Sequence, residues 1–351
     1  MGDKRTSKNL VTNNYSTLIE TIGSILKIGK NNAYQSINHI LTQTYWEIGK
    51  QIVEFEQKGK ERAAYGEELI KKLSNDLTKQ FGKGFSVQNL ERIRKFYVIW
   101  SKEQVVSIVQ EKQKSSAVMR IFKLSWTHYV RLMSIENVNE RKFYEVESEV
   151  NSWSVRELCR QFDSALYERL ALSKDKEGVQ KLAKKGQVIE KSSDLVKEPY
   201  VLEFLGIEEN SRYSESDLET SIINNLEKFL LELGRGFTFV ARQKRITSGV
   251  KHFYIDLVFY NRLLKCFVLI DLKIGELKHQ DIGQMQMYVN YFDREIKEDN
   301  ENNSIGLILC KENDQFIVEY TLPKNTKQIY AKKYQLYLPN KEELINQIKN
   351  I

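Results

Sequence analysis

Two aspartates and one lysine fall within two neighbouring strand-like runs of the sequence, HFYIDLVFY and KCFVLIDLK. The residues between the runs predict a turn at 261–264, which makes the two runs a β-hairpin. Asp271 and Lys273 are two residues apart on the second run, so they share one face of it, and Asp256 lies on the first run. The hairpin therefore gathers two acidic groups and one basic group in a small region.

The chemistry that suits this group is phosphodiester hydrolysis. Both aspartates interrupt apolar runs, where a charged carboxylate is costly unless it is paired or bound to a metal. Asp256, Asp271 and the carbonyl of Leu272 offer the oxygen ligands that Mg²⁺ or Mn²⁺ prefers. Lys273 would lie beside a metal-bound water or a phosphate, where its charge assists. The alternative is structural: Asp271 and Lys273 form a buried ion pair, and Asp256 caps the hairpin.

Glu219 is a third acidic candidate, on a helix expected over 216–234. It shares an apolar stripe with Ile223 and Leu226, which directs its carboxylate toward the buried side. Ser216 and Glu219 also fit a capping box, in which the glutamate would accept from the Ser216 amide. The pattern leaves both interpretations open.

Gln284 and Tyr288 lie four residues apart on a helix expected over 281–295, so they project from one face. If that face looks toward the hairpin, Gln284 positions a water or a phosphate, and Tyr288 stacks on a base or donates to a phosphate. Alternatively the helix simply packs with Tyr288 in the core.

The ordered set of these residues resembles the PD-(D/E)xK nuclease superfamily with the Q-x-x-x-Y extension of its RecB-like members. A closer resemblance, to the YhcG-like bacterial nucleases, is carried by FYIDLVFYNRLLKCFVLIDLKIGELKHQDIGQMQMYVNYFD together with YGEELIKKLSNDLTKQFGKGFSVQNLERIRKFY and NSWSVRELCRQ. It spans nearly the whole chain from about residue 15. It implies a helical N-terminal domain of helix-turn-helix or winged-helix type and a restriction-endonuclease-like α/β domain with a mixed central sheet.

The resemblance also assigns roles. It implies that Asp256 and Asp271 bind the metal, that Lys273 is the catalytic lysine, and that the site is completed by Glu219, Gln284 and Tyr288. Ile255 stands where the superfamily name has Pro, and Asp271 replaces the more usual Glu, which shortens the ligand by one methylene. Neither departure removes the set of groups. The resemblance leaves a homodimer open, because many nucleases of this kind dimerise.

The elements before the hairpin would have to position the nucleic acid. Apolar periodicity predicts helices over most of 15–170. One of them ends near Gly82, a short turn follows, and Ser86 suits the N-cap of the next helix, which makes a helix-turn-helix. The second helix carries a basic cluster of Arg92, Arg94 and Lys95. This cluster could contact phosphates or enter a DNA groove, and it is equally compatible with an ordinary solvent-exposed helix face.

A second basic cluster begins at the last residue of the strand-like run FTFVAR. It suits phosphate contact, and it equally suits an edge strand whose charges discourage aggregation. The cluster consists of Arg242, Lys244 and Arg245.

Length and charge agree with two domains. The chain has 351 residues, and its 54 Lys and Arg against 47 Asp and Glu give a net charge of +7. Residues 1–170 hold 27 basic and 20 acidic side chains, whereas residues 171–351 hold 27 of each. The excess positive charge therefore lies in the half expected to bind nucleic acid. A charged stretch at 171–197 predicts a linker between a domain over 15–170 and a nuclease domain over 198–351.

Three separated cysteines, Cys159, Cys266 and Cys310, indicate neither a disulfide framework nor a zinc site. No apolar run reaches the length of a membrane helix, so we expect a cytoplasmic protein that does not bind membranes. The function predicted is a metal-dependent nuclease that hydrolyses DNA. The alternatives are a nuclease acting on RNA, or an inactive nucleic-acid-binding or partner-binding protein on a nuclease fold.

Overall fold

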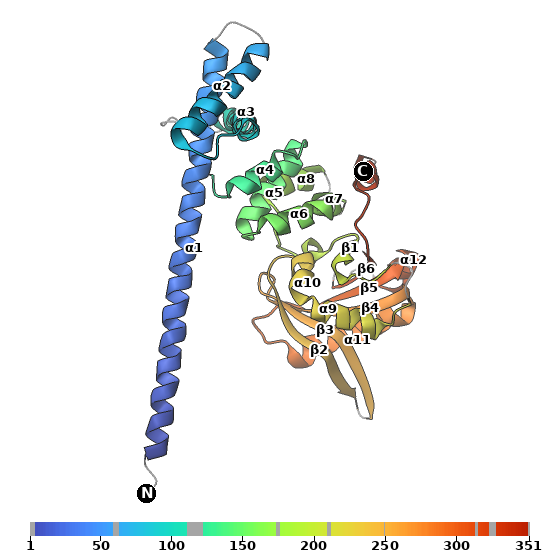
Figure 1. Cartoon of the computed structure of the whole chain (residues 1–351). Helices are drawn as coiled ribbons and strands as arrows, with labels where there is room; N and C mark the ends of the chain where they lie inside the picture. The colour runs from blue at the N-terminus through green and yellow to red at the C-terminus, as the bar shows by residue number, and fades with distance from the viewer. Residues whose placement is uncertain are drawn as a thin grey trace. The chain divides into compact units, whose positions relative to one another are not determined.

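The computed structural model of the chain describes residues 4–58, 63–110, 122–172, 176–208, 212–248, 250–312, 315–322 and 328–349 (Figure 1). The chain divides into two compact units, Met1–Glu136 and Asn137–Ile351.

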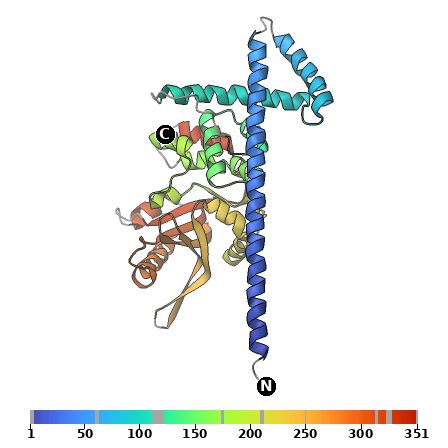
Figure 2. The ribbon, with the colours of Figure 1, turned by 90° about the vertical axis from the view of Figure 1, so that its left-hand side faces the viewer.

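The first unit consists of helices where it is described. They are α1 (Lys4–Lys58), α2 (Ala63–Phe81), α3 (Val87–Gln110) and α4 (Trp126–Leu132). Helix α3 crosses the second half of α1 steeply, as Figure 2 shows. The crossing is close because Gly49 has no side chain: a Cβ there would lie 2.4 Å from the carbonyl oxygen of Ile93. Phe96 and Trp100 of α3 are fully buried beside this contact.

A short glycine-containing turn joins α2 to α3, and whether the pair acts as a DNA-binding helix-turn-helix stays a prediction. Gly82 and Gly84 adopt φ angles of 85° and 121° between α2 and α3, a region that glycine enters without strain. The Ser86 hydroxyl accepts from the Asn89 amide at 3.3 Å, so Ser86 caps α3 as expected. In this unit no strand occurs in the described residues, so the β-wing of a winged helix is not among them.

The second unit begins with four helices, α5 (Val138–Val150), α6 (Val155–Asp163), α7 (Leu166–Ala171) and α8 (Lys176–Lys185). Further helices are α9 (Glu215–Asn224), α10 (Leu226–Leu233), α11 (His279–Tyr291), α12 (Gln315–Thr321) and α13 (Lys341–Lys349). Single turns lie at η1 (Ser192–Leu195), η2 (Glu203–Leu205) and η3 (Phe292–Ile296). The strands are β1 (Tyr200–Val201), β2 (Phe237–Ser248), β3 (Lys251–Asn261), β4 (Cys266–Glu276), β5 (Ile305–Glu312) and β6 (Ile329–Gln335).

These strands form one mixed sheet in the order β1-β6-β5-β4-β3-β2. β2, β3 and β4 are an antiparallel meander, and β4, β5 and β6 pair in parallel. Helix α11 makes the crossover from β4 to β5. The hairpin turn predicted at 261–264 is confirmed, as are the helical N-terminal half and the mixed central sheet.

The prediction of a single helix over 216–234 is wrong in one respect. Asn225 leaves helical geometry at φ −119° and ψ 32°, so the segment is two helices, α9 and α10. The side chain of Asn225 donates to the Ser221 carbonyl at 3.1 Å, which is the local competition that Asn offers a helix.

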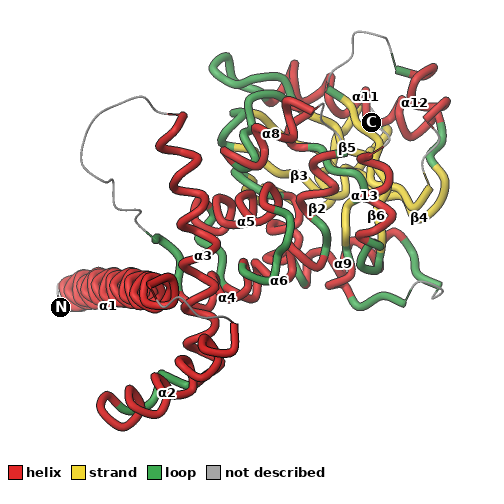
Figure 3. Tube along the Cα trace, turned by 90° about the horizontal axis from the view of Figure 1, so that it is seen from above, coloured by secondary structure: helices red, strands yellow, loops and turns green. Residues whose placement is uncertain are grey.

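Two apolar layers cover the sheet. Leu218, Ile222 and Phe229 of α9 and α10 pack on one face of it. Met285 and Val289 of α11 pack on the other. Figure 3 shows α9 and α11 on opposite sides of the strands. Gly306 of β5 admits α11 closely, since a Cβ there would lie 2.5 Å from Met285 Cγ.

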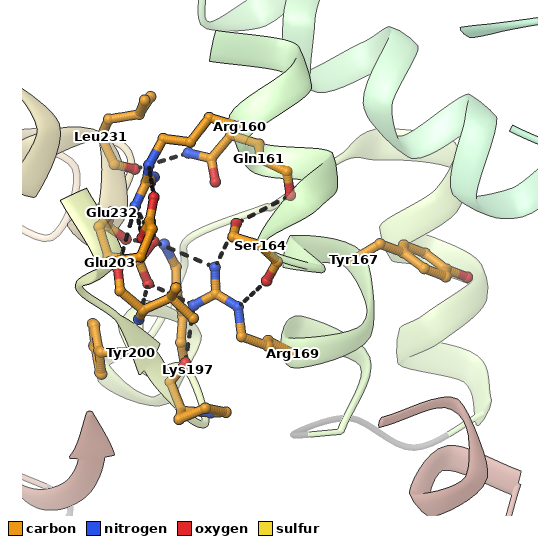
Figure 4. A network of polar contacts seen from close by, with 12 residues as sticks. Arg160, Gln161, Ser164, Tyr167, Arg169, Lys197, Tyr200, Glu203, Leu231 and Glu232 are labelled. Carbon is orange, nitrogen blue, oxygen red and sulfur yellow. Dashed lines mark hydrogen bonds and ion pairs between the residues drawn. The ribbon is translucent and has the colours of Figure 1, made fainter. Parts of the chain in front are cut away.

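A buried ionic network joins α6 and α7 to α10 within the second unit (Figure 4). Arg169 of α7 and Glu232 of α10 are fully buried, and Arg169 Nη1 lies 2.5 Å from Glu232 Oε1. Lys197 donates from its buried ammonium group to the carbonyl of Glu232. Arg160 of α6 lies 3.0 Å from Glu203 and 3.5 Å from Glu232.

The predicted domain boundary at 171–197 differs from the division between compact units, which falls between Glu136 and Asn137. The stretch expected to be a linker contains α8 with Leu182 buried, and it ends at the buried Lys197. Charge alone suggested an exposed linker, whereas Lys197 at its end is buried in the ionic network around Glu232. The domain ranges drawn from the sequence stay a prediction.

Cys159, Cys266 and Cys310 are free thiols. Within the residues that the structure describes, no helix has both the length and the apolar character needed to cross a bilayer.

Candidate active site

The site lies where the ladder between β3 and β4 stops. The last pairs of the ladder include Leu257 with Ile270, so Asp256 and Asp271 occupy the next opposed positions. There the Leu272 amide donates to the Asp256 carboxylate at 2.8 Å in place of a strand carbonyl. The strands separate at this point, and both aspartates are held at the opening.

Asp271 and Lys273 form the ion pair that the sequence left open. Lys273 Nζ lies 2.8 Å from Asp271 Oδ2 and 3.6 Å from Glu215 Oε2. Burial and the negative charge of Asp256 raise the pKa of Asp271 to about 7, although Lys273 lowers it. Burial opposes the charge of Lys273, but Asp271 and Glu215 hold its pKa above the ordinary value. The lysine is therefore a fixed positive charge near neutral pH.

Glu219 is a buried carboxylate and not a helix cap. The N-cap of α9 is Ser214, whose hydroxyl accepts from the Asp217 amide at 3.2 Å, while Asp217 accepts from the Ser214 amide. Glu219, 3% exposed, instead accepts from Arg242 and Gln243 of β2. The capping-box interpretation of Glu219 is wrong because the N-cap of α9 is Ser214, two residues before Ser216.

Gln243 connects two of the acidic groups, and the sequence analysis missed it. Its side-chain amide donates to Glu219 Oε2 at 2.5 Å and to Asp256 Oδ1 at 3.0 Å. Its φ angle of 48° is left-handed, which is uncommon for a residue with a side chain and strained inside a strand. Gln243 lies opposite Asp256, between the pairs Arg242–Leu257 and Lys244–Ile255. Only the register of β2 on β3 could have identified it.

Gln284 and Tyr288 face the same region from α11. The Gln284 amide donates to the Tyr288 hydroxyl at 2.5 Å, and that hydroxyl donates to the Tyr254 carbonyl at 2.8 Å. Tyr288 is fully buried, and burial together with the charge of Asp271 raises its pKa to about 12. Its ring therefore has no free face for stacking on a base, and its hydroxyl secures the β3 backbone.

The acidic groups fit a hard divalent cation. Burial raises the pKa of Asp256, and the charge of Glu219 adds to that shift. The two aspartates thus repel one another, which a cation would relieve, and oxygen donors suit Mg²⁺ or Mn²⁺. No cluster of three or more His, Cys, Asp or Glu side chains with metal-binding geometry occurs in the described parts of the chain. A cation here would be held by two aspartates and a main-chain carbonyl.

The two basic clusters are only partly available to a ligand. Arg94 lies 2.7 Å from Glu56, and Arg242 pairs with Glu219. The other four side chains are exposed, on α3 and on β2, namely Arg92, Lys95, Lys244 and Arg245.

The mixed sheet, with α9 and α11 on its two faces, belongs to a nuclease domain of the PDDEXK type. The YhcG PDDEXK nuclease domain matches residues 193–349, and the DUF1016 N-terminal domain matches residues 21–169. The Escherichia coli (strain K12) protein "Putative nuclease YhcG" is 36% identical over 355 residues, which cover 96% of this chain and 94% of that protein. The chain belongs to the YhcG family.

Two solved structures are distant matches. A repair endonuclease from Pyrococcus abyssi has 18% identity and a TM-score of 0.25, and a complex of EndoMS with double-stranded DNA has 16% identity and a TM-score of 0.26. Each match covers 38% of this chain and 50% of the other, so it spans half the length of those proteins. At these TM-scores the likeness carries no argument about substrate.

Proposed function

We propose that the chain is a divalent-metal-dependent deoxyribonuclease whose N-terminal half positions the DNA. The observation that carries the proposal is the opening of the β3–β4 ladder, which leaves Asp256 and Asp271 side by side with Lys273 held 2.8 Å from Asp271. Membership of the YhcG family supports a nuclease, and hydrolysis of DNA rather than RNA is our proposal.

Asp256, Asp271 and the Leu272 carbonyl would hold Mg²⁺ or Mn²⁺. A bound cation of this kind supplies positive charge that activates a water and neutralises the scissile phosphate. Lys273 is already protonated, so it is no base: it stabilises the negative charge that develops on the phosphate.

The remaining polar groups position these three. Gln243 holds Glu219 and Asp256 together, and Arg242 neutralises Glu219 from the other side. Gln284 and Tyr288 secure the backbone of β3 beside Asp256. We assign Gln243 and Tyr288 as positioning residues, because each acts through a neighbour.

We assign phosphate contacts to the exposed members of the two basic clusters that pair with no acid among the described residues, since such Lys and Arg side chains break no ion pair on binding phosphate. These are Arg92, Lys95, Lys244 and Arg245. Substituting one of them is expected to weaken DNA binding about equally for all sequences and to lower the dependence of affinity on salt.

Cleavage of supercoiled plasmid, linear duplex and single-stranded DNA tests the proposal, with Mg²⁺ or Mn²⁺ and with RNA as a further substrate. Asp271→Asn is the informative variant: a neutral amide fits a site where burial disfavours the charge, so the fold persists while cleavage is lost. Glu276→Gln, on the exposed end of the same strand, is the matched control. Wild-type protein that shifts DNA in a gel but cuts no substrate with either ion would favour the binding protein instead.

A further inference from the structure

Helix α1 carries a long exposed apolar surface. Seven of its residues form what we call the apolar stripe, each 47–68% exposed: Tyr15, Leu18, Ile19, Ile22, Leu26, Ile37 and Ile40. Single exposed apolar residues are normal on proteins, but a continuous row of this length marks a surface that another element covers.

The stripe repeats every eleven residues. Tyr15, Leu26, Ile37 and Ile48 form one series, and three turns of helix separate successive members. Ile22 and Phe55 belong to a second series with the same interval. Residues eleven apart point in nearly the same direction, so the stripe continues without a break into the second half of α1.

In that second half the same face lines a groove. The groove has a volume of 700 Å³ and runs between α1 and α2. Apolar side chains of both helices and of the turn after α2 form its walls, which also contain a few polar side chains. The apolar residues are Ile48, Ile52, Phe55, Leu69, Leu73, Leu77, Phe81 and Phe85, and the polar ones are Thr44, Glu47, Gln51 and Glu54. One face of α1 therefore carries the apolar stripe in its first half and one wall of the apolar groove in its second half. Figure 2 shows the first half of α1 extending past α2 and α3.

We propose that a second copy of this chain packs its α1 antiparallel on this face, so that the stripe of each copy fills the groove of the other. With the two-fold axis near residue 35, Tyr15 of one copy meets Phe55 of the second copy, Ile22 meets Ile48, and Ala33 meets Ile37. A parallel pair would set groove against groove and leave both unfilled. The antiparallel contact is self-complementary and closed, so it stops at a dimer.

The area suffices for a stable dimer. Residues 15–55 of α1 span about 60 Å, and a helix is about 10 Å wide, so each copy covers on the order of 600 Å² before α2 adds its share. The two copies together therefore bury on the order of 1,200 Å², and specific, stable interfaces bury about 1,200–2,000 Å² in total.

Two isoleucines of α1 provide a matched pair of variants. Ile37 lies in the stripe and Ile28 on the opposite side of the helix, because nine residues make two and a half turns. Both are 60% exposed, so neither substitution disturbs the fold of one copy. Light scattering after size exclusion is expected to give twice the chain mass for wild type and for Ile28→Glu, and the mass of one chain for Ile37→Glu. A wild type with the mass of one chain overturns the proposal, as does a dimer that Ile37→Glu leaves intact.

Cysteine cross-linking tests the direction. Tyr15→Cys with Phe55→Cys in one chain is expected to give a disulfide-linked dimer, with the wild type reporting any background from its own cysteines. Tyr15→Cys alone is expected to give none, because antiparallel helices place the two copies of residue 15 about 60 Å apart. A cross-link through Tyr15→Cys alone would establish a parallel pair and overturn the antiparallel contact.

Discussion

Removing the Arg169 guanidinium should destabilise the second unit severely. Arg169 is fully buried and donates to the Ser164 carbonyl at 2.8 Å, to the Pro199 carbonyl at 2.9 Å and to both carboxylate oxygens of Glu232 at 2.5 and 3.3 Å. Arg169→Met leaves the Glu232 charge buried, with the Val201 amide at 3.0 Å and Arg160 at 3.5 Å as its nearest remaining partners.

Breaking a buried ion pair on one side costs about 3–5 kcal/mol. For a unit of this size each kcal/mol shifts the melting temperature by about 2–4 °C, so Arg169→Met should melt about 6–20 °C lower. Differential scanning calorimetry measures this, and Arg262→Met, an exposed arginine of the same unit, should leave the melting temperature unchanged. The double variant Arg169→Met with Glu232→Met should recover part of the loss, because it removes the unpaired charge.

The pH dependence of unfolding tests the role of Arg169 in a second way. Burial would raise the pKa of Glu232, but Arg169, Lys197 and Arg160 lower it from 4.5 to about 2. A carboxyl with a depressed folded pKa stabilises above its unfolded value, and that stability is lost as the pH falls from about 4.5 toward 2. Arg169→Met should therefore unfold at a higher pH than wild type. Equal melting temperatures and equal acid transitions for Arg169→Met and wild type would refute the reasoning.

Three further predictions concern the site and α1. Gln243→Leu removes the amide that links the Glu219 and Asp256 carboxylates and should weaken Mn²⁺ binding by about 10–100-fold in calorimetry. Gln280→Leu, on the exposed side of α11, should leave the affinity for Mn²⁺ unchanged, and equal affinities for the two variants would contradict the positioning role of Gln243. Burial and a neighbouring carboxylate raise the pKa of Asp271 to about 7, so Mn²⁺ must displace a proton below that pH and its affinity should rise with pH up to about 7 and then level. Over the same rise in pH the metal-free protein loses the stability that the protonated Asp271 carboxyl gives it. A Mn²⁺ affinity that is flat from pH 5 to 8 would contradict this prediction. Gly49→Ala places a methyl group 2.4 Å from the Ile93 carbonyl oxygen and should destabilise the first unit by about 1–3 kcal/mol in urea unfolding. Gly23→Ala meets nothing within 4 Å and should stabilise the unit slightly. An unchanged free energy of unfolding for Gly49→Ala would contradict the close crossing of α1 and α3.

The elements that could be predicted from the sequence are those with a local signal. The two-residue spacing of Asp271 and Lys273 on a strand-like run predicted their common face, and the residues at 261–264 predicted the hairpin between β3 and β4. Gly82 and the N-cap residue Ser86 predicted the turn between α2 and α3. Asp256, Asp271 and Lys273 are brought together as their spacing required.

What could not be predicted depends on partners far away in the chain. Gln243 reaches Glu219 only because β2 pairs with β3 in one register and bends at a left-handed residue. Arg169, Lys197 and Glu232 read as ordinary surface charges, since nothing local shows that they are buried against one another. The buried position of Lys197 could not be predicted for the same reason, because a run of charges has the same local pattern whether or not some of its members are buried.

Cleavage and binding measured on one DNA by Lys273→Met test the central claim most directly. The variant removes the fixed positive charge, and the Asp271 carboxyl that it leaves behind becomes neutral by protonation. Single-turnover cleavage with Mg²⁺ should fall by about 10²–10³-fold. DNA affinity and melting temperature should remain those of wild type, and Lys228→Met, an exposed lysine of α10, should cut normally. Cleavage by Lys273→Met at the wild-type rate would contradict the assignment of this site to catalysis.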